Sequence, residues 1–320
     1  MSVLVYVENW EGSFKKASFE AVSYAAQLAQ QKGEDCIAIT TEVSDDASIL
    51  ANYGANKIYH IKGEAFRTYN NQVFASLINE VAKELNANTI VLSNTNNGKN
   101  MAPMIAIKSD AALVTNVLDL PESLSPLTIK RKVFSTKAYV YYSTQSEKVV
   151  LALTPNSFGV KENKVDTQVE DKAMNGASSN LSSVSIDKAT GKIPLPEAEL
   201  VISGGRGLKG PENWNMVEDL AKVIGAGTAC SKPVADMGWR PHSEHVGQTG
   251  LAINPELYIA IGISGAIQHL AGVSASKNIV VINSDAEAPF FKAADYGIVG
   301  DAFEIVPKLI EAIKKHKAAN

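Results

Sequence analysis

Short apolar runs alternate with segments of helical spacing along most of this chain, and this alternation limits its possible folds more than any other feature. In the first part of the chain, apolar runs predict strands at 3–8, 35–42, 57–62 and 89–94. Helical spacing predicts helices at 16–31, 71–86 and 98–113. Gly33 is expected to end the first of these helices. Strands that alternate with helices in this way predict an α/β fold, with a parallel sheet covered by helices.

The pattern changes from residue 127 onward. The stretch "LTIKRKVFSTKAYVYYSTQSEKVVLALTP" (127–155) predicts several extended strands with hairpin-like breaks, which we expect to be an antiparallel addition to the first sheet. Residues 171–198 are rich in Ser, Asn, Gly, Lys and Pro, and within them only "SSVSI" (182–186) is a candidate for a short edge strand. The stretch "KATGKIPLPE" (188–197) has the composition of a linker.

A second alternating block follows, so the chain is expected to form two α/β domains. Its strands are predicted at 198–205, 227–230, 257–263 and 278–283. Its helices are predicted at 212–225, 264–271 and 301–317, with Asp301 as the cap of the last. We therefore expect an amino-terminal domain at 1–190, a linker at 191–197 and a carboxyl-terminal domain at 198–320.

Composition excludes several classes of protein. The net charge of the 320 residues is −4, and no run of Lys and Arg supplies the basic stripe of a nucleic-acid binder. The two cysteines, Cys36 and Cys230, form no disulfide framework, which suits a reducing compartment. The first residues already have the pattern of a strand, so we expect no signal peptide, and the apolar runs are too short to cross a membrane. We expect a cytoplasmic protein without membrane insertion.

The stretch "GISGAIQHL" (262–270) places a Gly-Ser-Gly turn between a strand and a helix. A nucleophile elbow has the pattern Gly-x-Ser-x-Gly, but here the last position is Ala266. His269 is five residues after Ser264, about 140° around a helix, so it is badly placed to act as the serine's base. The turn suits an anion site with Ser264 as a ligand, although a plain N-cap serine explains it equally well.

The string "GRGLKG" (205–210) matches G-x-G-x-x-G, after a strand and before a helix with Pro211 near its first turn. The next strand continues into "GTACSK" and lacks the acidic residue that would hold a ribose, so the NAD fingerprint is incomplete. Arg206, between the glycines, is suited to meet a phosphate or to stack on a planar ring.

Further polar residues follow predicted strands, where α/β folds place ligand contacts. In "HVGQTG" (245–250), Gln248 and Thr249 offer groups that suit the mixed edge of a planar heterocycle. "HSEH" (242–245) has too few ligands for a convincing metal site, and we predict none. Asn283 ends a predicted strand and Asp301 begins the last helix, so both are expected near one shared site.

Taken together, these segments resemble the α subunit of electron transfer flavoproteins. The resemblance is strongest in "VGQTG" (246–250) and in the run from "PELYIAIGISGAIQHL" to "DYGIVGD" (255–301). "ELVISGGRGLKGPENW" (199–214) resembles the entry to the same domain, and "LSNTNNGKNMAP" (92–103) resembles the amino-terminal domain. The resemblance implies an amino-terminal domain that is nucleotide-binding-like and a Rossmann-like, FAD-binding carboxyl-terminal domain.

The resemblance also implies which residues hold FAD. By matching positions these are Arg206, Ser231, Lys232, Val246, Gly247, Gln248, Thr249, Ser264, Gly265, Ala266, Ile267, Gln268, His269, Asn283, Asp301 and Ala302. Thr249 would lie near flavin N5 and His269 near O2. Ser264 would serve the pyrophosphate, and Asn283 and Asp301 the adenosine end. The family usually has arginine where this chain has Lys232, which keeps the charge but loses the planar fork.

The implied function is that of an electron carrier without catalytic residues of its own. It would pair with a β subunit that contains AMP, accept electrons from acyl-CoA and other flavin dehydrogenases of fatty acid β-oxidation, and pass them to a quinone oxidoreductase. A second hypothesis is the α subunit of a bifurcating member, whose β subunit holds a second FAD, although "SDAALVTN" (109–116) looks more like the ordinary class. Less favoured hypotheses are a non-redox nucleotide-binding module and a serine hydrolase.

Overall fold

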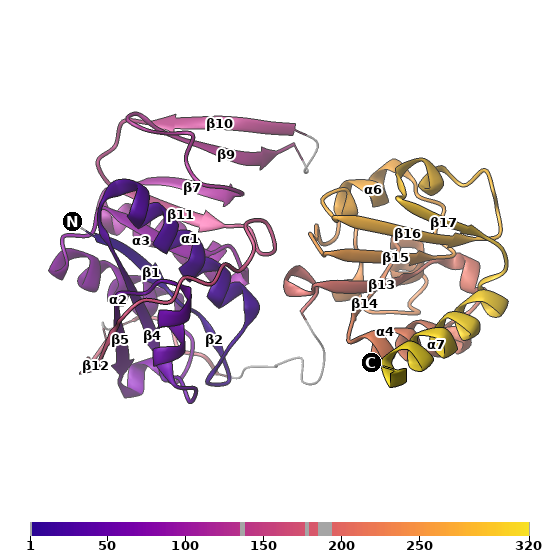
Figure 1. Cartoon of the computed structure of the whole chain (residues 1–320), viewed down its shortest axis with the longest axis horizontal. Helices are drawn as coiled ribbons and strands as arrows, with labels where there is room; N and C mark the ends of the chain where they lie inside the picture. Colours follow the sequence, from indigo (N-terminus) through magenta and orange to yellow (C-terminus); the bar gives the residue numbers. More distant parts are fainter. Residues whose placement is uncertain (1, 135–137, 177–178, 185–193, 320) are drawn as a thin grey trace. The chain divides into compact units, whose positions relative to one another are not determined.

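The computed structural model describes residues 2–134, 138–176, 179–184 and 194–319 (Figure 1). Contacts between Cα atoms divide the chain into two compact units, the first of residues 1–132 and 139–188 and the second of residues 133–138 and 189–320. Among the described residues, no helix has the length and apolar character needed to cross a membrane. The fold is a two-domain α/β fold, as the sequence predicts.

The first unit is built on a large, mostly parallel sheet with the strand order β10-β9-β7-β11-β6-β1-β4-β5-β12, and β8 pairs with β9 at one side. Its strands are β1 (Ser2–Tyr6), β4 (Asp35–Thr41), β5 (Lys57–Lys62), β6 (Thr89–Ser93), β7 (Ala112–Val117), β8 (Ser123–Leu124), β9 (Leu127–Val133), β10 (Ala138–Thr144), β11 (Val149–Leu153) and β12 (Gln168–Ala173). A small hairpin joins β2 (Asn9–Trp10) to β3 (Ser13–Phe14).

Helices cover both faces of this sheet, so its central strands are apolar on both sides. Along β1, Val3 and Val5 pack into the core on the side of α1, whereas Leu4 and Tyr6 pack on the side of α2 and α3. The helices of this unit are α1 (Lys16–Lys32), α2 (Asn71–Glu84) and α3 (Asn96–Ser109), with the 3-10 helices η1 (Ala47–Tyr53) and η2 (Glu64–Phe66). As predicted, α1 ends at Gly33, which adopts the left-handed conformation with φ of 66°.

Two parts of the first sheet differ from the prediction. The antiparallel addition exists, because β9 pairs antiparallel with β7 and β8, but β11 from the same stretch lies parallel between β6 and β7. All five residues of β11 are buried, as expected for a strand covered on both faces. The parallel edge strand β12 is not predicted, because its charged side chains face solvent and give no apolar signal.

Part of the predicted linker region can be compared with the structure. Residues 182–184 of the candidate edge strand form no strand, and residues 185 and 186 lie outside the described residues. Residues 188–193 of the linker candidate also lie outside them, whereas Leu195–Glu197 forms the 3-10 helix η3, whose Leu195 is buried in the core of the second unit. The domain boundaries themselves stay a prediction.

The second unit is a five-stranded parallel sheet with the order β14-β13-β15-β16-β17. Its strands are β13 (Leu200–Gly204), β14 (Gly227–Cys230), β15 (Leu257–Ile261), β16 (Asn278–Asn283) and β17 (Tyr296–Val299). Its helices are α4 (Asn215–Ile224), α5 (Lys232–Asp236), α6 (Ile267–Val273) and α7 (Ala302–Ala319), with the 3-10 helices η4 (Arg206–Leu208), η5 (Pro211–Asn213), η6 (His242–Glu244) and η7 (Pro289–Ala293).

The strand order of the second sheet fixes where a ligand can bind. Numbered along the chain, the strands lie in the order 2-1-3-4-5, so the direction of winding reverses between β13 and β15. In open α/β sheets, ligands bind in the crevice at the carboxyl ends of the strands on either side of such a reversal. The segments that follow β13 and β15 are the two glycine-rich stretches, 205–210 and 262–265.

Candidate functional site

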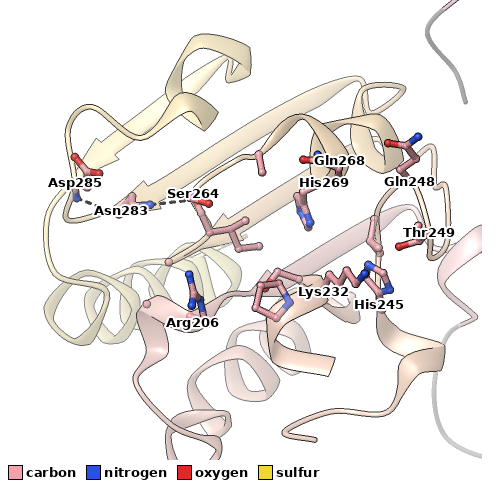
Figure 2. A pocket seen from close by; sticks show the side chains of 17 residues that line it. Arg206, Lys232, His245, Gln248, Thr249, Ser264, Gln268, His269, Asn283 and Asp285 are labelled. Carbon is pink, nitrogen blue, oxygen red and sulfur yellow. Dashed lines mark hydrogen bonds between the residues drawn. The ribbon is translucent and has the colours of Figure 1, made fainter. Parts of the chain in front are cut away.

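A cavity of about 540 Å³ opens at the carboxyl edge of the second sheet, on both sides of the β13–β15 reversal (Figure 2). It is lined by Arg206, Gly207, Ser231, Lys232, Pro233, His245, Val246, Gln248, Thr249, Gly262, Ile263, Ser264, Ala266, Gln268, His269, Asn283 and Asp285. The lining comes from the segments that follow β13, β14, β15 and β16, together with the loop at 245–249 and the start of α6. Four consecutive strands of the sheet thus contribute to one site.

Glycines allow the segments after β13 and β15 to cross in backbone contact. The amide of Gly205 donates to the carbonyl oxygen of Ile261 at 2.9 Å, and that of Gly207 donates to the carbonyl oxygen of Gly262 at 3.0 Å. A Cβ atom on Gly205 would lie 2.2 Å from the carbonyl oxygen of Gly262, and Gly262 itself has φ of +62°. This crossing requires glycine at these positions, and it places Arg206, between two of them, at the cavity.

The Gly-Ser-Gly turn does not form the N-cap that the sequence suggests. Helix α6 begins at Ile267 and its N-cap is Ala266, so the plain N-cap explanation of Ser264 is wrong. The reason is Gly265, whose φ of +80° keeps the chain out of the helical region before Ala266. Ser264 is exposed at the cavity, and the nearby His269 bonds to a different hydroxyl. The hydrolase hypothesis therefore has no serine–histidine pair here.

His269 is a buried, neutral histidine at the wall of the cavity. Its Nε2 atom lies 2.8 Å from the hydroxyl of Tyr258, and the side chain is only 7% exposed. Within the described residues, its buried Nδ1 atom has no hydrogen-bond partner. Burial, with a smaller contribution from His245, lowers the pKa of His269 to about 4, although the carbonyl of Val246 opposes this shift.

Two cations on different segments line the cavity. Arg206 follows β13 and Lys232 begins α5, and both are exposed. Neither side chain has an ion-pair or hydrogen-bond partner among the residues that the structure describes. Ser231, the N-cap of α5, lies buried beside Lys232. Such unpaired cations at a small-molecule cavity suit a ligand with anionic groups.

The two ends of the cavity have different side chains (Figure 2). At one end, Asn283 donates from Nδ2 to the carbonyl oxygen of Ile263 at 3.0 Å and accepts at Oδ1 from the amide of Asp285 at 3.0 Å. At the other end are Gln248 and Thr249, whose exposed side chains are free to meet a ligand edge. The amide of Gln248 donates to the carbonyl oxygen of Gln268 at 2.7 Å, which ties this loop to α6.

Most of the predicted site residues meet at this cavity. Those that line it are Arg206, Ser231, Lys232, Val246, Gln248, Thr249, Ser264, Ala266, Gln268, His269 and Asn283. Gly247, Gly265, Ile267, Asp301 and Ala302 are outside the lining. Asp301 instead caps α7, as predicted from the sequence, by accepting from the amide of Phe303 at 3.0 Å.

Some of the lining residues are not predicted from the sequence, namely Gly207, Pro233, His245, Gly262, Ile263 and Asp285. The signal that could have found them is position, because each lies within a few residues of a predicted strand end or beside a residue already chosen. His245 and His242 belong to "HSEH", and no group of metal-binding side chains is found in the described part of the chain.

The residues present fit a dinucleotide cofactor such as FAD. The cavity volume is within the usual range for small-molecule sites, about 300–1,000 Å³. Its cations, which have no partner among the described residues, suit phosphates, and its mixed hydrogen-bonding groups suit a heterocycle. The buried Nδ1 atom of His269 also has no hydrogen-bond partner among the described residues. At the reversal, the backbones of Gly205, Gly207 and Gly262 pack so closely that a Cβ atom on any of them would lie within 3 Å of the neighbouring segment.

Comparisons with known proteins identify the family of this chain. The family model described as the electron transfer flavoprotein FAD-binding domain matches residues 194–274, and the electron transfer flavoprotein domain matches residues 3–186. The α subunit of the electron transfer flavoprotein from Syntrophomonas wolfei is 33% identical over 314 residues, 97% of this chain and 98% of the relative. The corresponding subunit from Bacillus subtilis is 31% identical over 98% of this chain and 97% of the relative. The one from Pseudomonas aeruginosa is 34% identical over 98% of this chain and 100% of the relative. The chain therefore belongs to the family of electron transfer flavoprotein α subunits.

Proposed function

We propose that this chain holds FAD in the cavity of its second unit and uses it to carry electrons between other proteins. One observation supports this most strongly: four consecutive strands of the sheet converge, at the reversal in strand order, on a cavity that brings together most positions matched to the FAD site. The chemistry that FAD supplies is the uptake and release of electrons. The chain itself then needs to bind and orient the cofactor, and no nucleophile or general base is required.

The order of residues along the cavity suggests how the cofactor lies. We propose that Asn283 is at the adenosine end, with Asp301 and Ala302 beyond the lining, and that Ser264 and Gly265 serve the pyrophosphate. Lys232, Gln248, Thr249 and His269 would surround the flavin ring. This agrees with Figure 2, where Asn283 and Ser264 lie at one end, Gln248 and Thr249 at the other, and His269 between them.

The proposed partners follow from the family. We propose a heterodimer with a β subunit that contains AMP, electron input from acyl-CoA and other flavin dehydrogenases, and output to a quinone oxidoreductase, in the cytoplasm. The competing hypothesis is a bifurcating protein, whose β subunit holds a second FAD and oxidises NADH.

The experiment that tests the proposal is an absorption spectrum of the co-expressed heterodimer, with a count of flavins per dimer. One flavin that an acyl-CoA dehydrogenase reduces in the presence of its substrate supports the ordinary carrier. Two flavins and reduction by NADH support the bifurcating protein. A heterodimer that is colourless and takes up no added FAD would contradict both.

A further inference from the structure

His245 is the buried histidine of "HSEH" (242–245), a motif to which the proposed function gives no role. Its side chain is 5% exposed and lines the candidate flavin cavity, whereas His242, three residues earlier, is exposed. The motif therefore places one imidazole in the wall of the cavity and the other in solvent.

The residue before His245 is fixed to a neighbouring helix. Glu244 is 6% exposed, and its carboxylate accepts two hydrogen bonds from the guanidinium of Arg240, at 2.7 and 2.8 Å. The guanidinium also forms an ion pair with Glu218 of α4 at 3.1 Å and lies 5.3 Å from the ring centroid of Trp214. These contacts hold the backbone from which His245 projects.

The imidazole packs against the loop at 247–250. A Cβ atom on Gly250 would lie 2.7 Å from Nδ1 of His245, and one on Gly247 would lie 3.3 Å from Nε2. The two glycines thus leave the space that the ring occupies, and Gly247 has φ of +151°, which other residues rarely adopt. The amide of Leu251 closes the loop by donating to the carbonyl oxygen of His245 at 2.8 Å.

Helix α6 also holds this loop. A Cβ atom on Gly272 would lie 2.4 Å from the amide nitrogen of Gly247, so the two backbones are in contact. The side chains of Gln248 and Thr249 are exposed and line the cavity, and Figure 2 shows them at the same end as His245. The loop therefore combines a fixed backbone with two side chains that can meet a ligand.

We propose that His245 is a positioning residue: its imidazole supports the loop at 247–250, and through this loop it sets where Gln248 and Thr249 meet the flavin. This inference rests on the proposed function, because it assigns a role toward FAD. The support is the packing of a flat ring against two glycines, so it does not require a charge on the ring.

The charged groups around the ring agree with a neutral imidazole. Burial lowers the pKa of His245, and among its neighbours Asp236 opposes this shift, whereas Lys232 and His242 add to it. His269 on α6 also interacts with it. The ring is therefore uncharged at neutral pH, and it lies against the loop without the cost of burying a charge.

The first measurement is amide hydrogen exchange of the loop in the heterodimer after removal of FAD. The amides of Gln248 and Leu251 are both hydrogen-bonded, so they report on the loop. We expect His245→Ala to accelerate their exchange at least about tenfold, because the ring that supports the loop is lost. His242→Ala, at the exposed histidine of the same motif, is the matched control and should leave both rates unchanged. Wild-type rates in His245→Ala would overturn the proposal.

Two further variants test whether the packing of the ring holds the loop. His245→Phe retains a flat ring without nitrogen atoms, and we expect exchange rates close to those of the wild type. Rates as fast as in His245→Ala would show that the ring nitrogens hold the loop, and would overturn the proposal. If His245→Ala does not fold, His245→Asn is the milder variant. It should still accelerate exchange, and wild-type rates in it would equally overturn the proposal.

The second measurement is the reduction potential of the bound flavin, which a general loss of stability would leave unchanged. We expect His245→Ala to shift this potential, and His245→Phe and His242→Ala to retain the wild-type value. In a background of Gln248→Ala and Thr249→Val, His245→Ala should shift the potential less, because the side chains through which it acts are gone. An equal shift in the two backgrounds would show that His245 meets the flavin directly, and would overturn the positioning role.

The two measurements separate this inference from the proposed function. If the heterodimer binds no flavin, the proposed function fails, but exchange in the flavin-free protein still decides whether His245 supports the loop. If flavin is bound and His245→Ala retains the wild-type exchange rates and potential, the inference fails and the proposed function stands.

Discussion

Lys232 lies where the family resemblance leads us to expect an arginine, and it lines the cavity in which we propose that the flavin binds. It begins α5, is exposed, and lines the cavity without an ion-pair partner in the described part of the chain. A lysine provides a point charge, whereas an arginine would also provide a planar surface for stacking and a fork of donors. We therefore expect this residue to determine how positive charge is distributed at the proposed flavin site.

We expect Lys232→Arg to shift the reduction potential of the bound flavin, because the guanidinium spreads the charge and stacks on planar rings. Lys232→Gln removes the charge and is expected to weaken FAD binding about tenfold, equivalent to roughly 1.4 kcal/mol. Redox titration and fluorescence titration with FAD measure the two effects. Lys222→Arg on the exposed surface of α4 is the control, and identical redox titrations for Lys232→Arg and the wild type would contradict the expectation.

His269 also makes the stability of the flavin-free second unit depend on pH. Its folded-state pKa of about 4 is below the ordinary value of 6.5, so between these values the unfolded chain binds more protons than the folded one. Stability is therefore complete above pH 6.5 and falls as the pH is lowered toward 4. From pH 7 to pH 5 we expect a loss of about 2 kcal/mol from this residue.

The measurement is urea unfolding of flavin-free protein at both pH values. His269→Gln has no titrating group at this position, so its free energy of unfolding should fall less than that of the wild type over the same interval. An equal fall in the two proteins would show that His269 does not contribute.

At the scale of single elements, the position of the loop after β11 is held by hydrogen bonds to one buried carboxylate. Glu20 on α1 is 1% exposed and accepts hydrogen bonds from the amides of Asn156, Phe158 and Gly159 at 2.7–2.8 Å. A cluster of backbone N–H groups like this is an anion-binding arrangement, here filled by the protein's own side chain. Glu20 thus anchors the loop to the helix that packs on it.

We expect Glu20→Gln to destabilise the first unit by about 2–4 kcal/mol, because the amide retains one acceptor oxygen and turns two donors toward backbone donors. Glu80→Gln, at an exposed position of α2, is the matched control and should change stability by less than about 0.5 kcal/mol. Thermal and urea unfolding followed by circular dichroism provide the comparison. Equal stabilities of the two variants would exclude the anchoring role.

Elements with strong local signals can be predicted from the sequence, and the rest cannot for identifiable reasons. Helix α1 is predictable because its apolar spacing ends at Gly33, a residue suited to the left-handed cap. The parallel pairing of β11 is not, because an apolar run indicates burial but not direction. The link between Tyr258 and His269 depends on packing across eleven residues of chain, and no motif marks it.

At the scale of the whole molecule, the two units have similar α/β sheets but differ at their carboxyl edges. In the first unit, Glu8 follows β1 and accepts a hydrogen bond from the hydroxyl of Thr95, the N-cap of α3, at 2.6 Å and another from Asn97. Burial raises the pKa of this carboxyl group. Glu8 thus places a carboxyl group at the carboxyl ends of β1 and β6, where an open α/β sheet receives a ligand, and this argues against the nucleotide-module hypothesis for this unit.

This difference predicts which part of the chain responds to the cofactor. Every residue that lines the cavity belongs to the second unit, so FAD should stabilise that unit by mass action, by about 2.7 kcal/mol at a free concentration of one hundred times the dissociation constant. Removal of FAD from the heterodimer should accelerate amide hydrogen exchange in β13, β15 and α6, and leave β1, β6 and β11 unchanged. Peptide-level exchange with and without FAD measures this. Equal acceleration in both sheets would mean that the first unit also responds to FAD, and this would contradict the prediction.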